Sequence, residues 1–289
     1  MAKSLACALT HVRQESFFLK KWIDYYGGIV GKENLYIVLD GDDWTPDFSL
    51  DGLNVEIILG APRARIRNDR WVAKEMSRRA NALRKRYSFV IRGDVDEYVV
   101  IDPESGLNWE QAFAEIGEDG YLFALGVDMV QSAGEVGALD RSAPILGQRT
   151  YGYVADRYTK PFVISRFNNW TGGAHRLINR PVKISNHFTL FHMALADQSI
   201  AQERMAARGG GAQHQSNVQH QTLRIDAISD TVKAAPTLFD FPTAAMIGRR
   251  DFAIEPDGTV ASRPRASSAE GATELGLFTR IPDRFHGLI

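Results

Sequence analysis

The residues best suited to chemistry are three acids, Asp94, Asp96 and Glu97, in the stretch IRGDVDEYVV. Apolar residues lead into these acids and follow them, as expected for a turn after a buried strand. Alternate side chains at a strand end can converge on one cation, and Mg²⁺ and Mn²⁺ prefer carboxylate oxygens. Three acids so close together would repel one another without a cation. The pattern favours a divalent-metal site at Asp94 and Asp96; the alternative is a polar turn that caps the next helix.

Histidines downstream of this turn could complete such a site. His175, His187 and His192 lie within eighteen residues of one another. Neutral imidazole is a good ligand for Mn²⁺. His175 follows two glycines, where backbone could approach a ligand, and His192 lies in the apolar stretch FTLFHM. These two are equal candidates for a metal ligand, and at least one of the three histidines is expected to be structural instead.

Strands and helices must bring these residues together, and hydrophobic periodicity predicts such elements. The predicted strands are 4–10, 35–39, 55–59, 87–91 and 121–130, and the predicted helices are 15–26, 69–87 and 194–208. Gly27, Gly28 and Gly31 are expected to end the first helix. This order predicts an α/β fold with a mostly parallel sheet flanked by helices. Polar residues follow three of the strands, and they should share the edge where such sheets bind ligands.

The composition excludes several classes of protein. Hydrophobic residues make up 44% of the 289 residues and charged residues 24%, with a net charge of −1. These values exclude a globally basic nucleic-acid binder and a charged disordered chain. The single cysteine, Cys7, excludes an intrachain disulfide and a zinc site of several thiolates. No apolar run approaches the ~20 residues of a membrane-spanning helix. The N-terminus predicts a strand rather than a signal peptide, so we expect a cytoplasmic protein.

The charge is distributed unevenly along the chain. Residues 61–87 contain ten Lys and Arg against two acids, and residues 91–120 contain one Arg against nine acids. One interpretation of the basic stretch is a solvated helix face. The other is that residues near the helix N-terminus meet a phosphate. The candidates are Arg63, Arg65, Arg67, Arg70 and Lys74.

The acidic stretch resembles the Asp-x-Asp region of nucleotide-sugar-dependent glycosyltransferases with the A-type fold. It is most similar to the family-2-like and family-92-like branch, whose motif reads D-x-D-E-F/Y. ALTHVRQESFFLKKWIDYYGGIVG resembles the opening strand, polar loop and E-x-x-x-L-x-x-W helix of that branch, and NLYIVLDGDDW its second strand. KPFVISRFNNWTGGAHRL and FTLFHM resemble a downstream region that carries a histidine. The resemblance covers about 4–205 and departs at Arg13-Gln14-Glu15, where such enzymes often read Lys/Arg-Asn-Glu.

The resemblance implies a role for each matching residue. Thr10 and Arg13 would lie beside the base and ribose of a nucleotide-sugar donor, and Asp40 would bind the edge of the base. Asp94 would contact the ribose or a metal-bound water. Asp96 would ligate Mn²⁺ or Mg²⁺, which would bridge the diphosphate and neutralise the charge that grows as the sugar departs.

Two further residues are candidates on the acceptor side. If the transfer inverts configuration, a carboxylate must take a proton from the acceptor hydroxyl, and Asp128 in YLFALGVDMV is the candidate. If the transfer retains configuration, no such base is needed and Asp128 could bind the acceptor; a strand-end cap is an equal alternative. Trp170 in FNNWTGG could stack on a sugar face or pack in the core.

Together these features predict a metal-dependent glycosyltransferase that moves a sugar to a saccharide acceptor, in the synthesis of a cell-surface polysaccharide or glycolipid. Residues 1–130 would form the nucleotide and metal half, and residues 131–205 the acceptor half. Residues 206–289 would form an accessory, irregularly helical region. Any membrane contact would be peripheral, and no nucleic-acid partner is expected.

Three other functions compete with this one. A phosphatase of the Asp-x-Asp type would carry its acidic loop after the first strand, with Thr or Val where Tyr98 stands. A nucleotidyltransferase shares the sheet and metal, but it would need a Gly-rich phosphate loop, and THVRQES has no glycine. A non-enzymatic module could bind nucleic acid or an anionic surface through residues 61–87, although the neighbouring acidic stretch opposes a broad positive face.

Overall fold

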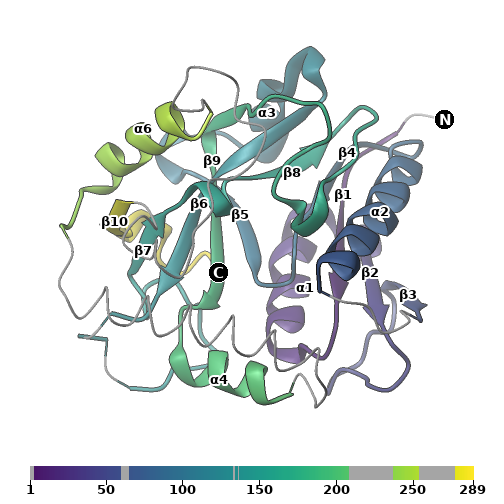
Figure 1. Ribbon diagram of the computed structural model, residues 1–289, viewed down its shortest axis with the longest axis horizontal. Coiled ribbons are helices and arrows are strands. Elements are labelled where there is room, and N and C mark those ends of the chain that lie inside the picture. The colour runs from purple at the N-terminus through teal and green to yellow at the C-terminus, as the bar shows by residue number, and fades with distance from the viewer. Residues whose placement is uncertain (1–2, 60–64, 133, 136, 208–236, 254–276) are drawn as a thin grey trace.

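The computed structural model describes residues 3–59, 65–132, 134–135, 137–207, 237–253 and 277–289. These residues form one large mixed sheet with helices on both faces (Figure 1). The strands are β1 (Ser4–Val12), β2 (Leu35–Asp40), β3 (Asn54–Ile58), β4 (Tyr87–Arg92), β5 (Glu97–Ile101), β6 (Tyr121–Val130), β7 (Tyr151–Val154), β8 (Lys160–Ile164), β9 (Ile184–Leu195) and β10 (Leu277–Arg280). The predicted α/β class is confirmed.

The sheet is parallel at one side and mostly antiparallel at the other. Its order is β10-β7-β6-β8-β4-β1-β2-β3, and β9 pairs with both β6 and β5. The pairs β3–β2, β2–β1 and β1–β4 are parallel. From β4 onward the pairs β4–β8, β8–β6, β6–β7 and β7–β10 are antiparallel. The parallel block β3-β2-β1-β4 therefore comes from the first hundred residues, where the sequence predicted alternating strands and helices; β6 and β9 form a further parallel pair.

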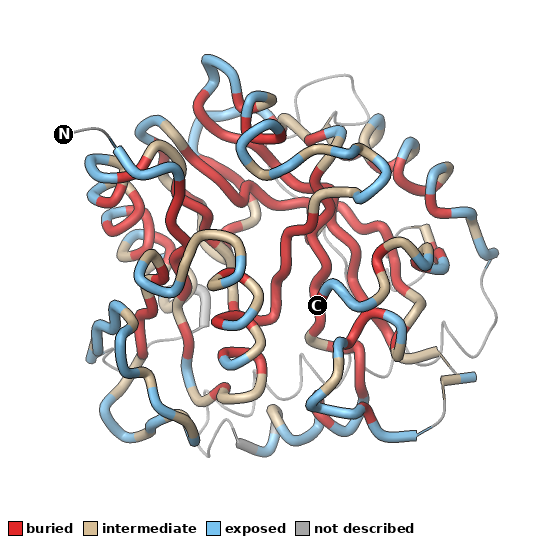
Figure 2. Tube along the Cα trace, turned by 180° about the vertical axis from the view of Figure 1, so that it is seen from behind, coloured by how far each residue is buried: buried red, intermediate tan, exposed pale blue. Residues whose placement is uncertain are grey.

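The two long helices cover opposite faces of β1. Successive strand residues point to opposite faces of a sheet. Ala6 and Ala8 pack in one buried cluster with the apolar face of α1 (Ser16–Val30), whereas Cys7 and Leu9 pack with α2 (Arg65–Leu83). β6 is buried at every position and pairs with β7, β8 and β9, so it lies at the centre of the core (Figure 2).

The first helix is longer than the sequence predicted. It begins after Glu15, whose side chain accepts a hydrogen bond from the Phe18 backbone N–H. It continues through Gly27 and Gly28 and ends at Gly31, where φ is 84°. Only the last of the three glycines adopts a positive φ, which favours glycine at the end of a helix. Each internal glycine costs about 1 kcal/mol relative to alanine, which the buried face of the helix offsets.

The later segments also join the sheet. Helices α3 (Trp109–Phe113), α4 (Gln198–Ala207) and α6 (Phe241–Asp251) follow β5, β9 and the undescribed residues 208–236, respectively. β10 pairs with β7, and Phe241, Ile281 and Phe285 belong to the same buried cluster as α1. The described parts of 206–289 therefore share one core with 1–205. The loop predicted at 259–273 lies outside the described residues.

Among the described residues, no helix combines the length and apolar character needed to cross a bilayer.

Candidate active site

The predicted polar clusters meet at one edge of the sheet, where β1, β2 and β4 end. Thr10 is fully buried, and its hydroxyl donates to the Gly93 carbonyl at 3.0 Å, which ties β1 to the residue after β4. The Nε2 atom of His11 lies 3.4 Å from a carboxylate oxygen of Asp40 at the end of β2. Parallel pairing in register brings these strand ends together, as the alternating pattern predicted.

Arg13 lies at the same edge and links β1 to the end of β2. Its guanidinium donates to the Asp40 carbonyl at 2.7 Å and forms a two-point ion pair with Asp43, at 2.5 and 2.7 Å. The Arg13 hydrogen bond lowers the pKa of Asp43. Arg67 lies exposed in the first turn of α2. Of the other candidates for phosphate contact, Arg63 and the side chain of Arg65 lie outside the described structure.

The three acids, which we call the acidic turn (Asp94, Asp96 and Glu97), have very different surroundings. Asp94 keeps 42% of its side chain exposed, and Arg92 and Lys160 lie 3.3 and 3.5 Å from its carboxylate. Glu97 is only 2% exposed and forms an ion pair with Lys160, the first residue of β8. Burial raises the pKa of Glu97, and the Lys160 charge opposes this rise.

Asp96 meets a cation from helix α4, which runs along the bottom of Figure 1. Arg204 donates to the Asp96 carboxylate at 2.7 Å and also pairs with Glu15, the residue that caps α1. Its guanidinium lies 4.9 Å from the centre of the Phe18 ring, a cation–π contact. Burial would raise the pKa of Asp96, but the Arg204 charge and nearby His192 hold it well below its usual value.

His192 and Asp128 form a hydrogen-bonded pair beside the acidic turn. They are direct neighbours in the parallel pairing of β9 with β6, and the His192 Nδ1 atom lies 2.7 Å from the Asp128 carboxylate. Tyr158 stacks on the imidazole, with ring centres 3.9 Å apart. The other ring nitrogen, Nε2, lies 3.9 Å from Asp96. Both side chains of the pair are buried: Asp128 is 1% exposed and His192 is 6% exposed.

His175 and Trp170 occupy structural positions in the described residues. The His175 Nδ1 atom lies 2.8 Å from the Arg157 carbonyl, and burial lowers the pKa of this imidazole well below its usual value. Trp170 is 2% exposed, and its indole N–H donates to the Pro161 carbonyl at 2.9 Å. A ring buried on that scale offers no face to a sugar, so the structure supports core packing for Trp170 and not the expected acceptor contact.

The arrangement does not fit the divalent metal that the sequence led us to expect. Within the ranges that the structure describes, no group of three or more His, Cys, Asp or Glu side chains could hold a metal ion. Asp96 is bonded to Arg204 and Glu97 to Lys160. His175 uses Nδ1 at a backbone carbonyl, as described above. Mn²⁺ or Mg²⁺ would have to displace ion pairs that are already formed.

Sequence reasoning missed two charged residues of this site, Lys160 and Arg204. Lys160 is the first residue of β8, and no residue of that strand is acidic. Arg204 lies in a polar helix, where a basic residue is common and does not by itself indicate a site. Their signal is weak because their partners lie 63 and 108 residues away along the chain. Glu15 was visible only as part of the opening-helix motif.

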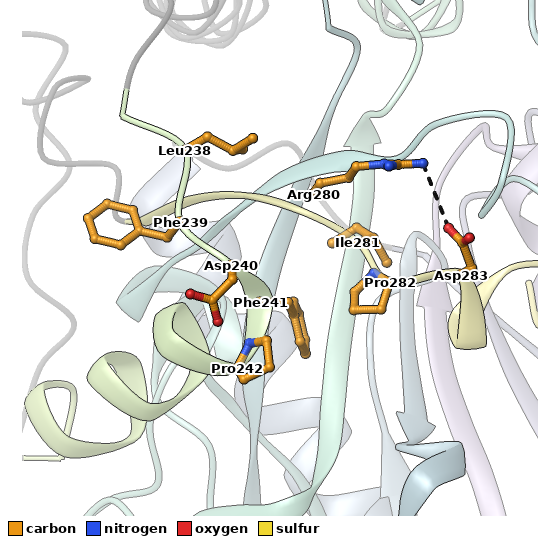
Figure 3. Close-up of a pocket in the computed structure, with 9 residues that line it drawn as sticks. All are labelled: Leu238, Phe239, Asp240, Phe241, Pro242, Arg280, Ile281, Pro282 and Asp283. Atoms are coloured by element: carbon orange, nitrogen blue, oxygen red, sulfur yellow. Dashed lines mark ion pairs between the residues drawn. The ribbon is translucent and has the colours of Figure 1, made fainter.

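A shallow hollow of about 400 Å³ lies elsewhere, between the start of α6 and the end of β10 (Figure 3). Its lining is mainly apolar, including Phe241, Ile281 and Pro282, and its Arg280 and Asp283 side chains pair at 3.7 Å. None of the predicted site residues lines it, so its chemistry does not extend the site.

Comparison with known proteins adds little to this geometry. No family model and no curated protein sequence matches the chain. One solved structure, described as a mannose-1-phosphate geranyltransferase from Thermus thermophilus, aligns over 96% of this chain and 73% of its own, with 13% identity and a TM-score of 0.28. A TM-score this low carries no argument, so any functional conclusion depends on the site itself.

Proposed function

We propose that the protein is a glycosyltransferase that moves a sugar from a nucleotide-sugar donor to a saccharide acceptor. The supporting observation is the shared strand edge, where Asp40, His11 and the acidic turn meet at the ends of parallel strands. Ligands of open α/β sheets bind at such an edge. The resemblance of these same stretches to nucleotide-sugar enzymes supplies the substrate class.

On the donor side, we assign the base and ribose to the ends of β1 and β2. Asp40 and Arg13 are the polar groups there, and Thr10 holds β1 against Gly93 from within the core. Asp94 is the most exposed acid of the turn, so it is the one that can reach a ribose hydroxyl. Arg67, exposed in the first turn of α2, is the proposed contact for the donor's phosphates.

On the acceptor side, we propose that His192 acts with Asp128 if the transfer inverts configuration. The bond between the anomeric carbon of the sugar and the diphosphate breaks, the acceptor oxygen bonds to that carbon, and the acceptor proton passes to Nε2 of His192. Asp128 would orient the imidazole through Nδ1, at 2.7 Å. This assignment replaces a base at Asp128, whose carboxylate is 1% exposed and is bonded to the imidazole.

A nucleotide-binding measurement tests the proposal. Thermal unfolding of the full chain would be followed with each common nucleoside diphosphate, in Mn²⁺ and separately in EDTA. A ligand that binds the native state raises the unfolding temperature by mass action. We expect one base to give a clear rise and Asp40→Asn to weaken that ligand about tenfold or more, because the charged contact to the base is lost.

Asp51→Asn is the matched control, since Asp51 lies exposed in the loop after β2 and should leave binding unchanged. If no nucleoside diphosphate shifts the unfolding temperature under either condition, the proposed function is wrong.

A further inference from the structure

Each carboxylate of the acidic turn is already paired with a cationic side chain of the protein. Lys160 lies between Glu97 and Asp94, and Arg204 holds Asp96. Both cations come from outside the turn, from the start of β8 and from α4. The repulsion among three neighbouring acids, which suggested a metal ion, is therefore relieved by the fold itself.

The Lys160 pair is an internal part of the structure. Lys160 is 5% exposed and Glu97 is 2% exposed. Removing one partner of a buried ion pair leaves the other charge without solvent or compensation, which is strongly unfavourable. Lys160 is also fixed by the sheet, because β8 pairs with both β4 and β6. A metal ion would therefore gain little by replacing Lys160.

Arg204 is held from three sides. It contacts Asp96 at 2.7 Å, pairs with Glu15, and lies over Phe18. Its side chain is 13% exposed, so a small part of it remains open to a ligand. A guanidinium carries five N–H donors, and those left free by two carboxylates can meet phosphate oxygens.

We propose that Lys160 and Arg204 fill, at the acidic turn, the place of the divalent cation in the enzymes that this chain resembles, so that nucleoside diphosphate binds without a metal ion. This inference rests on the proposed function for its ligand. The ion pairs at the acidic turn do not depend on that function. A fixed ammonium and guanidinium would stabilise the diphosphate charge as a metal ion does, through charge-assisted hydrogen bonds.

The first test measures Mn²⁺ binding to the full chain without nucleotide, from the loss of the free-Mn²⁺ signal in electron paramagnetic resonance. We expect no saturation of the wild type up to about 1 mM Mn²⁺, the weak end of measurable affinity. Arg204→Gln frees Asp96 and Glu15 from their cation, and it should bind Mn²⁺ at least about tenfold more tightly because two carboxylates become uncompensated. Arg204→Lys keeps the charge and should behave like the wild type.

Arg141→Gln is the matched control. Arg141 pairs with Glu203, the residue before Arg204 on α4, and does not contact the acidic turn in the described structure. Circular dichroism and thermal unfolding check that each variant is folded. Micromolar Mn²⁺ binding by the wild type that Asp96→Asn abolishes would overturn the inference, as would unchanged Mn²⁺ affinity in a folded Arg204→Gln.

The second test compares nucleoside diphosphate affinity in EDTA and in Mn²⁺. Equal affinity supports the inference, and binding that requires Mn²⁺ overturns it while leaving the proposed function intact. Failure of every nucleotide under both conditions overturns the proposed function and with it the ligand named here. The Mn²⁺ titration still decides whether the turn has its own cations in place of a metal.

Discussion

Residues that are adjacent in the sequence have different chemical capacities in this site. Asp94 is the most exposed acid of the turn, Asp96 is paired with Arg204, and Glu97 is buried against Lys160. All three acids are ion-paired, but they differ in exposure: Asp94 keeps 42% of its side chain exposed, whereas Asp96 and Glu97 are buried.

Asp128 gives a prediction at the residue scale. Asp128→Asn keeps the shape of the side chain but removes the charge that orients His192, and we expect kcat to fall on the order of 100-fold with little change in the donor KM. His192→Asn should lower kcat at least as much. Steady-state kinetics with the donor identified by thermal shift make the measurement.

Asp119→Asn is the control for this pair, because Asp119 forms an exposed ion pair with Lys183. Full kcat in a folded Asp128→Asn variant contradicts the role of the pair, and a rise in KM alone would make Asp128 a binding residue.

At the scale of elements, the site depends on how closely β6 packs against the segment before β8. A Cβ atom on Gly126 would lie 2.0 Å from the Tyr158 carbonyl carbon, well inside a van der Waals contact. Tyr158 is also the ring that stacks on His192. Gly126, in the centre of β6, therefore allows the close approach of the residue whose ring stacks on the imidazole.

Gly126→Ala is expected to lower the free energy of unfolding by about 1–3 kcal/mol, because backbone must move to admit the methyl group. Urea unfolding followed by tryptophan fluorescence measures this change. Gly28→Ala is the contrasting variant: apart from its own helix backbone, no atom of the described residues lies within 4 Å of a Cβ placed there, and a helical Gly→Ala change should stabilise by about 1 kcal/mol. Equal unfolding midpoints for Gly126→Ala and the wild type would show that the contact between Gly126 and the Tyr158 backbone is not tight.

At the scale of the whole molecule, the last residues complete the core of the first two hundred. Phe285 is fully buried and contacts Phe191 of β9 and Phe241 of α6, with ring centres 5.3 and 5.5 Å apart. Arg284 adds an ion pair with Asp102, just after β5. These contacts join the described end of the chain to the strands that carry the site.

Phe285→Ala tests this unity. We expect a loss of about 3–5 kcal/mol in the free energy of unfolding, with one cooperative transition, because the cavity opens in the common core. Leu288→Ala is the control, since Leu288 is 38% exposed. If unfolding instead shows two separate transitions and Phe285→Ala shifts only one of them, residues 206–289 form an accessory region that unfolds on its own.

The sequence by itself determined the elements whose signals are local. Hydrophobic periodicity located the first four predicted strands and the two long helices, although α2 begins and ends four residues before the predicted 69–87. Chain order placed Thr10, Asp40 and Asp94 at one edge, because parallel strands joined by helices point the same way. The end of α1 was misjudged, because glycine weakens a helix while tertiary packing decides whether it continues.

Only the tertiary structure decided which charges meet. Arg204 and Asp96 are 108 residues apart, and Asp128 and His192 are 64 residues apart, yet each pair is in direct contact. Such partners depend on strand register and helix placement, which arise from packing of the whole core rather than from local pattern. The acids were visible in the sequence; the cations that pair with them, and the burial of Trp170, were consequences of the fold.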